Sequence, residues 1–240
     1  MSKKIALVFG GTRGIGAACV HRLAEDGYDV AYTYVSSSPN LPPTIASSKT
    51  KGYAVDIREV SQIEKVFQDV AHDFGSMPHC VLANAGINVP PGPMATFDSK
   101  SFRDLVEINI VGAFNVLSAA AKHVVDGGTI IGLSTSMVRV GIPGGGPYTA
   151  TKAAVESLLR SMAKELAPRK IRVNGVAPGP VDTDLFRAGK NEEALARSAA
   201  LSPFNRVGRT QEVAEVVAFL ASEKASWVHG QIVQPNGGMI

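Results

Sequence analysis

The chain has 240 residues, of which 45% are hydrophobic, and it carries a formal net charge of +3. That length and apolar content are enough for a sizeable buried core, and the scattered charges give no indication of binding to nucleic acid or to an anionic membrane. The 2 cysteines and 5 histidines show neither a disulfide framework nor metal-ligand spacing, so we expect no metal site.

The first predicted element is a strand at residues 5–9, a short apolar run of the kind that is buried on both faces of a sheet. It is too short for a signal peptide, and no apolar stretch approaches the ~20 residues that span a bilayer, so we expect a cytoplasmic protein with no membrane partner. The strand leads into Gly10-Gly11-Thr12-Arg13-Gly14-Ile15-Gly16 and then into a helix at residues 17–25. A glycine-rich turn in this position permits positive φ angles, lets the backbone approach a pyrophosphate and presents the helix N-terminus to it. The context therefore predicts nucleotide binding.

A second strand is predicted at residues 29–35 and is followed by Ser36-Ser37-Ser38. Sites that prefer NAD usually carry an acidic residue near this point, where it binds the ribose hydroxyls. Here Tyr34 and the serines stand in its place, and Arg13 in the glycine turn offers a guanidinium to a 2′-phosphate. This combination predicts NADPH rather than NADH as the cofactor, unless Arg13 simply faces water.

The rest of the chain alternates between strands and helices. Residues 38–51 are rich in Ser, Pro and Thr, so any helix there is expected to be short or broken. Further strands are predicted at residues 52–55, 79–83, 128–133, 171–177 and 230–234, and helices at 59–74, 99–125, 148–166 and 210–222. Residues 184–207 have weak periodicity and are interpreted as a substrate-binding flap. With no repeat and no linker, the pattern predicts a single α/β domain over residues 1–240, a Rossmann-type doubly wound parallel sheet of about seven strands flanked by helices.

Tyr148 and Lys152 lie one turn apart on the same face of a predicted helix. The tyrosine pKa is ordinarily near ~10, and an adjacent ammonium stabilises the phenolate, so the pair is suited to exchange a proton with an alcohol or carbonyl without a metal. The ordinary alternative is a packed ring beside a solvated amine. Asn109 lies inside another predicted helix, where an asparagine marks a kink, a water site or an exposed position.

Groups suited to ligand binding follow several predicted strands at their carboxyl ends, which is where open α/β sheets bind ligands. In chain order, the motifs are Gly10-Gly11-Thr12-Arg13-Gly14-Ile15-Gly16, Asp56-Ile57, Asn84-Ala85-Gly86, Asn109, Ser134, Tyr148-Thr149-Ala150-Thr151-Lys152 and Pro178-Gly179-Pro180-Val181-Asp182-Thr183. This ordered set resembles the short-chain dehydrogenase/reductase family along nearly the whole chain, and most of all the bacterial 3-oxoacyl-[acyl-carrier-protein] reductases and the naphthol-reductase-like carbonyl reductases. The resemblance implies an NADPH-dependent enzyme that reduces a ketone, either a 3-oxoacyl thioester or a small to medium carbonyl compound, to a secondary alcohol by hydride transfer.

The resemblance also implies a role for each motif. Tyr148 would be the general acid, Lys152 would lower the Tyr148 pKa and hold the nicotinamide ribose, and Ser134 would bind the substrate oxygen. Asn109 would hold a water that continues a proton relay from Lys152. The implied cofactor contacts are Gly10, Thr12, Arg13, Gly14, Ile15, Gly16, Tyr34, Ser36, Asp56, Ile57, Asn84, Ala85, Gly86, Tyr148, Lys152, Pro178, Gly179, Val181 and Thr183.

The catalytic hydroxyl is ambiguous because Ser134, Thr135 and Ser136 are adjacent. Pro143 suggests the longer form of the loop before Tyr148 and so favours Ser134, with Thr135 as the alternative. Two rival functions stay open: an NAD-linked alcohol dehydrogenase that works in the oxidative direction, and a non-catalytic nucleotide-binding regulatory protein. The resemblance further implies a homotetramer, or else a homodimer, that takes a small-molecule substrate.

Overall fold

One sheet runs through the protein, and the computed structural model describes residues 3–36 and 41–240. The strands, in spatial order, are β3 (Thr44–Ile45), β4 (Ser48–Ala54), β2 (Asp29–Tyr34), β1 (Ile5–Phe9), β5 (Cys80–Ala83), β6 (Thr129–Leu133), β7 (Arg172–Val176) and β8 (Ile232–Val233). All neighbouring strands are parallel except β3 and β4. The chain moves outward from β1 to β4 and then returns to β5, so the strand order reverses between β1 and β5, where doubly wound sheets bind nucleotides. The predicted doubly wound α/β fold is confirmed.

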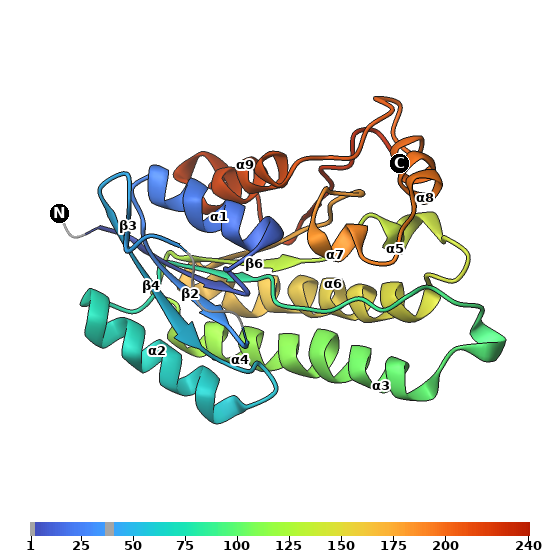
Figure 1. Cartoon of the computed structure of the whole chain (residues 1–240). Coiled ribbons are helices and arrows are strands. Elements are labelled where there is room, and N and C mark those ends of the chain that lie inside the picture. Colours follow the sequence, from blue (N-terminus) through green and yellow to red (C-terminus); the bar gives the residue numbers. More distant parts are fainter. Residues whose placement is uncertain (1–2, 37–40) are drawn as a thin grey trace.

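Helices cover both faces of this sheet (Figure 1). On one face lie α1 (Gly14–Glu25) and α9 (Thr210–Ala221), and on the other lie α2 (Val60–Phe74), α4 (Ala113–His123) and α6 (Gly146–Leu166). Successive residues of β1 point to opposite faces, so Leu7 belongs to the apolar core beneath α6 and Val8 to the core beneath α1. Because both faces are buried, the central strands are continuous apolar runs, as the sequence pattern predicts.

The main departure from the predicted elements is in residues 38–51, where the sequence predicts at most a short or broken helix. The described part of this segment forms the antiparallel hairpin of β3 and β4 instead. Pro42 and Pro43 have no N–H to donate within a helix, and the Pro43 carbonyl oxygen accepts a hydrogen bond from the Thr50 N–H over 2.8 Å. Of the serines that follow β2, those at 37–38 lie outside the described residues.

The longest apolar helical stretch packs into the fold. Ser99–His123 is helical throughout, as α3 (Ser99–Val106), a π-helical turn at Glu107–Gly112, and α4. Its 25 residues would be enough to cross a membrane by length and composition, which differs from our expectation that no stretch approaches that length. However, 44% of its most apolar window is buried inside the protein, and α4 packs against α2 and α6. A helix packed in a protein core can have the same length and apolar composition as a membrane-spanning helix.

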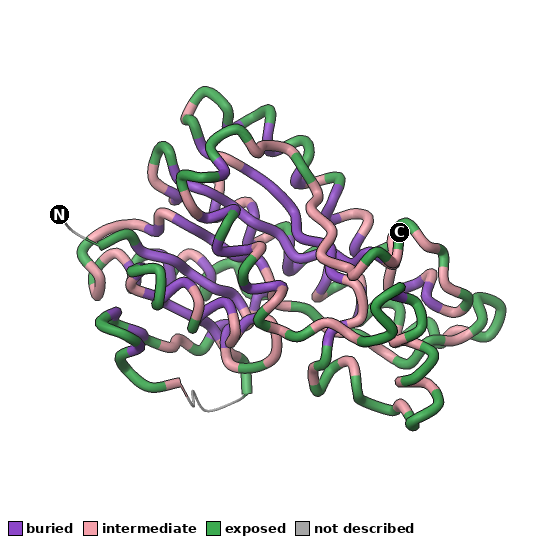
Figure 2. Tube along the Cα trace, turned by 90° about the horizontal axis from the view of Figure 1, so that it is seen from above, coloured by how far each residue is buried: buried purple, intermediate pink, exposed green. Residues whose placement is uncertain are grey.

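Short helices cover the carboxyl-terminal end of the sheet. α5 (Met137–Val140), α7 (Asp184–Arg187) and α8 (Glu192–Ala199) lie at the end of the molecule that also holds the C-terminus (Figure 1). This end is mostly half-buried or exposed, in contrast to the buried strands (Figure 2). α7 begins where Thr183 Oγ1 accepts from the Phe186 N–H over 3.1 Å, and α8 begins where Asn191 Oδ1 accepts from the Ala194 N–H over 2.9 Å. Two capped helices therefore occupy the region predicted as a flap.

Candidate active site

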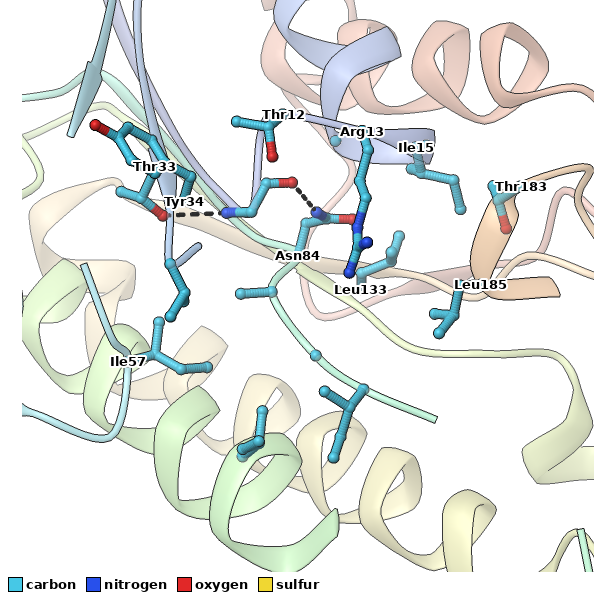
Figure 3. Close-up of a pocket in the computed structure, with 18 of the residues that line it drawn as sticks. Thr12, Arg13, Ile15, Thr33, Tyr34, Ile57, Asn84, Leu133, Thr183 and Leu185 are labelled. Atoms are coloured by element: carbon cyan, nitrogen blue, oxygen red, sulfur yellow. Dashed lines mark hydrogen bonds between the residues drawn. The ribbon is translucent and has the colours of Figure 1, made fainter. Parts of the chain in front are cut away.

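The glycine turn connects β1 to α1 and is tied to two neighbouring strands. The Gly10 N–H donates to Thr33 Oγ1 over 3.1 Å, and the Asn84 side-chain amide donates to the Gly10 carbonyl oxygen over 2.8 Å (Figure 3). Gly10 and Gly14 have backbone φ angles of +75° and +54°, which residues other than glycine rarely adopt. A Cβ on Gly16 would lie 1.9 Å from the Gly10 carbonyl oxygen, so only glycine fits there. The turn therefore brings the start of α1 against the ends of β1 and β5.

A cavity of about 370 Å³, which we call the first cavity, opens beside this turn (Figure 3). The residues of the predicted site that line it are Gly10, Thr12, Arg13, Gly14, Ile15, Gly16, Tyr34, Ser36, Asp56, Ile57, Asn84, Ala85, Gly86, Ser134, Tyr148, Lys152 and Thr183. Gly179 and Val181 line a neighbouring cavity instead, and Pro178 and Asn109 line neither of the two. The fold thus brings together motif residues that are up to 173 positions apart, from Gly10 to Thr183.

Arg58 and Thr33 also line the first cavity, and sequence reasoning missed both. Arg58 Nε donates to Asp56 Oδ1 over 3.0 Å, and Arg58 Nη2 donates to Asp56 Oδ2 over 2.5 Å. These hydrogen bonds lower the pKa of Asp56 and keep its carboxylate ionised at neutral pH. Arg58 could have been predicted to line the site from its position, because it follows Asp56 by two residues in the same turn. Thr33 carried no such signal, because only the pairing of β1 with β2 places its hydroxyl against Gly10.

Tyr148 and Lys152 lie near the start of α6, beside the end of β6. The buried Lys152 ammonium donates to the Leu133 carbonyl oxygen over 3.1 Å, and Tyr148 is half-buried. Desolvation lowers the pKa of Lys152 to about 8 and raises the pKa of Tyr148 to about 12. The direction for Tyr148 is opposite to the one that the resemblance implies, because Lys152 contacts the β6 carbonyl and burial dominates. Tyr148 is therefore a protonated phenol at neutral pH.

Asn109 joins the π-helical turn to the segment that follows β5. Its Oδ1 accepts from the Ile87 N–H over 2.9 Å, and its Nδ2 donates to the Ile87 carbonyl oxygen over 2.9 Å and to Thr151 Oγ1 over 3.2 Å. The side chain is buried and all of these contacts are to protein groups. Asn109 therefore fixes the backbone around Gly86, where an added Cβ would lie 3.3 Å from Lys152 Nζ. We interpret it as a positioning residue for Lys152.

A second cavity, of about 730 Å³, adjoins the first, and Tyr148, Thr183 and Leu185 line both. Its walls come from residues 88–91, from the loop at 137–145 and from α7 and α8. Most of the lining side chains are apolar. Tyr148, the predicted general acid, is thus one of the residues that the two cavities share.

The two candidate hydroxyls at the end of β6 face different surroundings. Ser134 Oγ donates to Glu156 Oε1 over 2.9 Å, within a cluster in which the buried Glu156 carboxylate also binds Arg139 and Arg160. Ser134 lines the first cavity, whereas Thr135 lines the second cavity together with Tyr148. The contact of Thr135 Oγ1 with the nearest carbonyl oxygen is long, at 3.5 Å. The Ser134 proton is therefore engaged, and the Thr135 hydroxyl is the freer donor.

The comparisons with known proteins identify the family of this chain. A family model described as Enoyl-(Acyl carrier protein) reductase matches residues 10–240. A structure from Burkholderia cenocepacia J2315, described as a short chain dehydrogenase in complex with NADP, is 31% identical and has a TM-score of 0.89, and the match covers 100% of this chain and 98% of that chain. The chain belongs to the short-chain dehydrogenase/reductase family.

Two relatives of this short-chain dehydrogenase/reductase carry more specific names. The 3-oxoacyl-[acyl-carrier-protein] reductase FabG of Staphylococcus aureus is 35% identical over 98% of this chain and 98% of its own. NADPH-dependent aldehyde reductase 2, chloroplastic, of Arabidopsis thaliana is 34% identical over 100% of this chain and 95% of its own. The resemblance to the family and to its 3-oxoacyl-[acyl-carrier-protein] reductases is confirmed.

Proposed function

We propose that this short-chain dehydrogenase/reductase uses NADPH to reduce a ketone to a secondary alcohol, with Tyr148 as the general acid. Tyr148 carries the proposal because it lines both the cavity beside the glycine turn and the larger, mainly apolar cavity. A side chain at that junction is placed to contact cofactor and substrate together. Burial raises its pKa to about 12, so the phenol holds its proton at neutral pH, as a proton donor must.

The first cavity fits a dinucleotide. No side chain larger than hydrogen fits at Gly16, and α1 starts at this turn, so its N-terminus favours a pyrophosphate. The exposed Arg13 lines the cavity, and Tyr34 and Ser36 supply no carboxylate that would repel a 2′-phosphate. The A. thaliana relative is named as NADPH-dependent, and the B. cenocepacia structure is a complex with NADP. These observations support NADP(H) over NAD(H).

The chain's own residues would supply position and protons. When bound, the reduced nicotinamide supplies a hydride to the carbonyl carbon. Tyr148 donates its phenolic proton to the carbonyl oxygen as negative charge develops there. The Lys152 ammonium has two N–H donors beyond the one given to the Leu133 carbonyl, and we assign to them the stabilisation of the phenolate that forms. We assign the second hydrogen bond to that oxygen to Thr135 rather than to Ser134, since the Ser134 hydroxyl is bound to Glu156.

The test is the loss of reduced-nicotinamide absorbance with NADPH and with NADH in parallel. The panel holds a 3-oxoacyl thioester, a cyclic ketone, a vicinal diketone, a quinone and, because of the family model's description, a 2-enoyl thioester. The proposal expects consumption of NADPH with at least one carbonyl compound and a slower rate with NADH. Reduction of the enoyl thioester alone, or binding of NADPH with no turnover on any compound, would contradict it.

Arg13→Ala is expected to raise the Kd for NADPH about tenfold and to leave the Kd for NADH within a factor of about two. A hydrogen bond to a charged group is worth about 1.5–3 kcal/mol, and NADH lacks the 2′-phosphate that would receive it. The measurement is a fluorescence titration of each cofactor. Arg103→Ala, which removes an exposed arginine from α3, is the matched control. Equal weakening of both cofactors would show that Arg13 does not bind the 2′-phosphate.

The kcat/KM for reduction is expected to fall as the pH rises through about 8. The pKa of Lys152 is lowered to about 8, so the ammonium is present below that pH and lost above it, while the phenol of Tyr148 stays protonated. The fall should approach about tenfold per pH unit, and Lys152→Arg, with its permanent charge, should remove it even where kcat is lower. A wild-type profile that stays flat up to about pH 10 would contradict the assignment of Lys152.

Three expectations stay predictions. The resemblance implies a homotetramer or a homodimer. The large apolar side chains of Phe114 and Trp227 are 52% and 99% exposed, so they are available to contact another subunit. Closure of the flap at residues 184–207 over the second cavity is proposed from its position. The cytoplasmic location is a prediction from the sequence alone, and the printed name of the A. thaliana relative includes the word chloroplastic.

A further inference from the structure

The charged side chains that line the second cavity are both positive, and the proposed reduction gives neither of them a role. Its lining side chains are mainly apolar, and the charged ones are Lys190, which follows α7, and Arg197 on α8. Among the described residues that line it, none is an aspartate or a glutamate. The described lining is therefore mainly apolar, with two positive side chains and no negative one.

The two cations differ in their partners. Arg197 Nη1 donates to Glu193 Oε1 over 2.5 Å, so a carboxylate already lies against this guanidinium. Lys190 donates to the Phe186 carbonyl oxygen and lies 4.3 Å from the centroid of the Phe186 ring. Within residues 3–36 and 41–240, no carboxylate oxygen lies within 4.0 Å of Lys190 Nζ.

The Lys190 ammonium therefore has N–H donors that remain free to bind a ligand. An ammonium has three N–H donors, and one of them is taken by the Phe186 carbonyl. Desolvation lowers the pKa of Lys190, which is the expected result when a cation is partly removed from water without an anion beside it. An anionic group in the cavity would relieve this cost and accept the free donors.

We propose that Lys190 binds a carboxylate of the substrate, so that the natural substrate is a carbonyl compound with an apolar body and a negatively charged end. This inference rests on the proposed function, since it deepens the assignment of the second cavity as the substrate site. A carboxylate matches one unpaired ammonium with two free donors. A doubly charged phosphate would call for a second unpaired cation, and Arg197 is bound to Glu193.

The test compares 4-acetylbenzoate with its methyl ester, which share a ketone and an aromatic body and differ in charge. Calorimetric Kd values are measured on the NADP⁺-loaded protein, where no turnover occurs. Wild type is expected to bind the carboxylate about tenfold or more tightly than the ester, as a charge-assisted hydrogen bond allows. Lys190→Gln should lose about tenfold for the carboxylate and less than about twofold for the ester. Lys224→Gln, which removes the same charge from an exposed position outside both cavities, should lose neither.

Each outcome separates this inference from the proposed function. Equal binding of both compounds, binding of neither, equal losses in Lys190→Gln, or the same loss in Lys224→Gln would overturn the role of Lys190. A charge preference that depends on Lys190, with no reduction of either ketone by NADPH, would support the role of Lys190 and count against the reductase. Reduction of both ketones with no effect of Lys190→Gln would support the reductase and count against the role of Lys190.

Discussion

Tyr148→Phe is expected to lower kcat by about a thousandfold or more and to leave the Kd for NADPH within a factor of about three. The change removes the hydroxyl that we assign as the proton donor to the developing alkoxide, and general acid catalysis by a positioned side chain contributes typically about 10²–10⁴-fold. The ring stays in place at the junction of the two cavities, so the contact with the cofactor is largely retained. Steady-state kinetics and a fluorescence titration of NADPH measure the two quantities.

Tyr28→Phe is the matched control for this variant. The Tyr28 hydroxyl donates to the Ala221 carbonyl oxygen over 3.0 Å, and the buried Tyr28 is not among the residues that line the two cavities. Its removal should cost about 1 kcal/mol of unfolding free energy and leave kcat unchanged. A Tyr148→Phe protein that keeps a tenth or more of wild-type kcat would refute the acid assignment. Loss of NADPH binding in that variant would assign Tyr148 to cofactor binding instead.

Thr135→Val is expected to lower kcat/KM by about a hundredfold, because the loss of one hydrogen-bond donor to a developing oxyanion costs about 10²–10³. Valine keeps the shape of the side chain and replaces only the hydroxyl of a residue that lines the second cavity. Ser134→Ala should change kcat/KM by less than about threefold, since its hydroxyl serves Glu156. The same substitution should lower the unfolding free energy by about 1–2 kcal/mol, because the buried carboxylate loses a donor.

Kinetics and urea denaturation of the two variants, made side by side, decide between the hydroxyls. A large loss of kcat/KM in Ser134→Ala with unchanged stability would restore the assignment that the loop length favours. Losses of similar size in both variants would mean that neither hydroxyl acts alone. The comparison is informative because the residues are adjacent in the chain and have different partners.

Features that depend on neighbours in the sequence were predictable. The glycine turn follows from the order of an apolar strand, glycines and a helix, and the positions of Tyr148 and Lys152 one turn apart on α6 follow from the helical repeat. The run at residues 5–9 is buried on both faces because it is β1 in the middle of a parallel sheet. In each case the local pattern and the global fold require the same residues.

Features that depend on the packing of distant segments were not predictable. Successive side chains at the end of a strand point in opposite directions, and only the packing of β6 against α6 turns Ser134 toward Glu156, 22 residues away. The direction of the Tyr148 pKa likewise depends on where the Lys152 ammonium points, which is toward the Leu133 carbonyl. The β3–β4 hairpin replaced an expected broken helix because the proline content excluded a helix without specifying the pairing of Thr44 with Lys49.

The most direct test of hydride transfer uses NADPH in which both hydrogens on the reduced carbon of the nicotinamide are replaced by deuterium. Wild-type protein is incubated with this cofactor and a ketone that it consumes, and the alcohol is analysed by mass spectrometry and NMR. The proposal predicts one deuterium on the carbinol carbon of the product, and no labelled alcohol from Tyr148→Phe with the cofactor still bound. Consumption of NADPH that leaves the alcohol carbon unlabelled would contradict hydride transfer to a carbonyl by this protein.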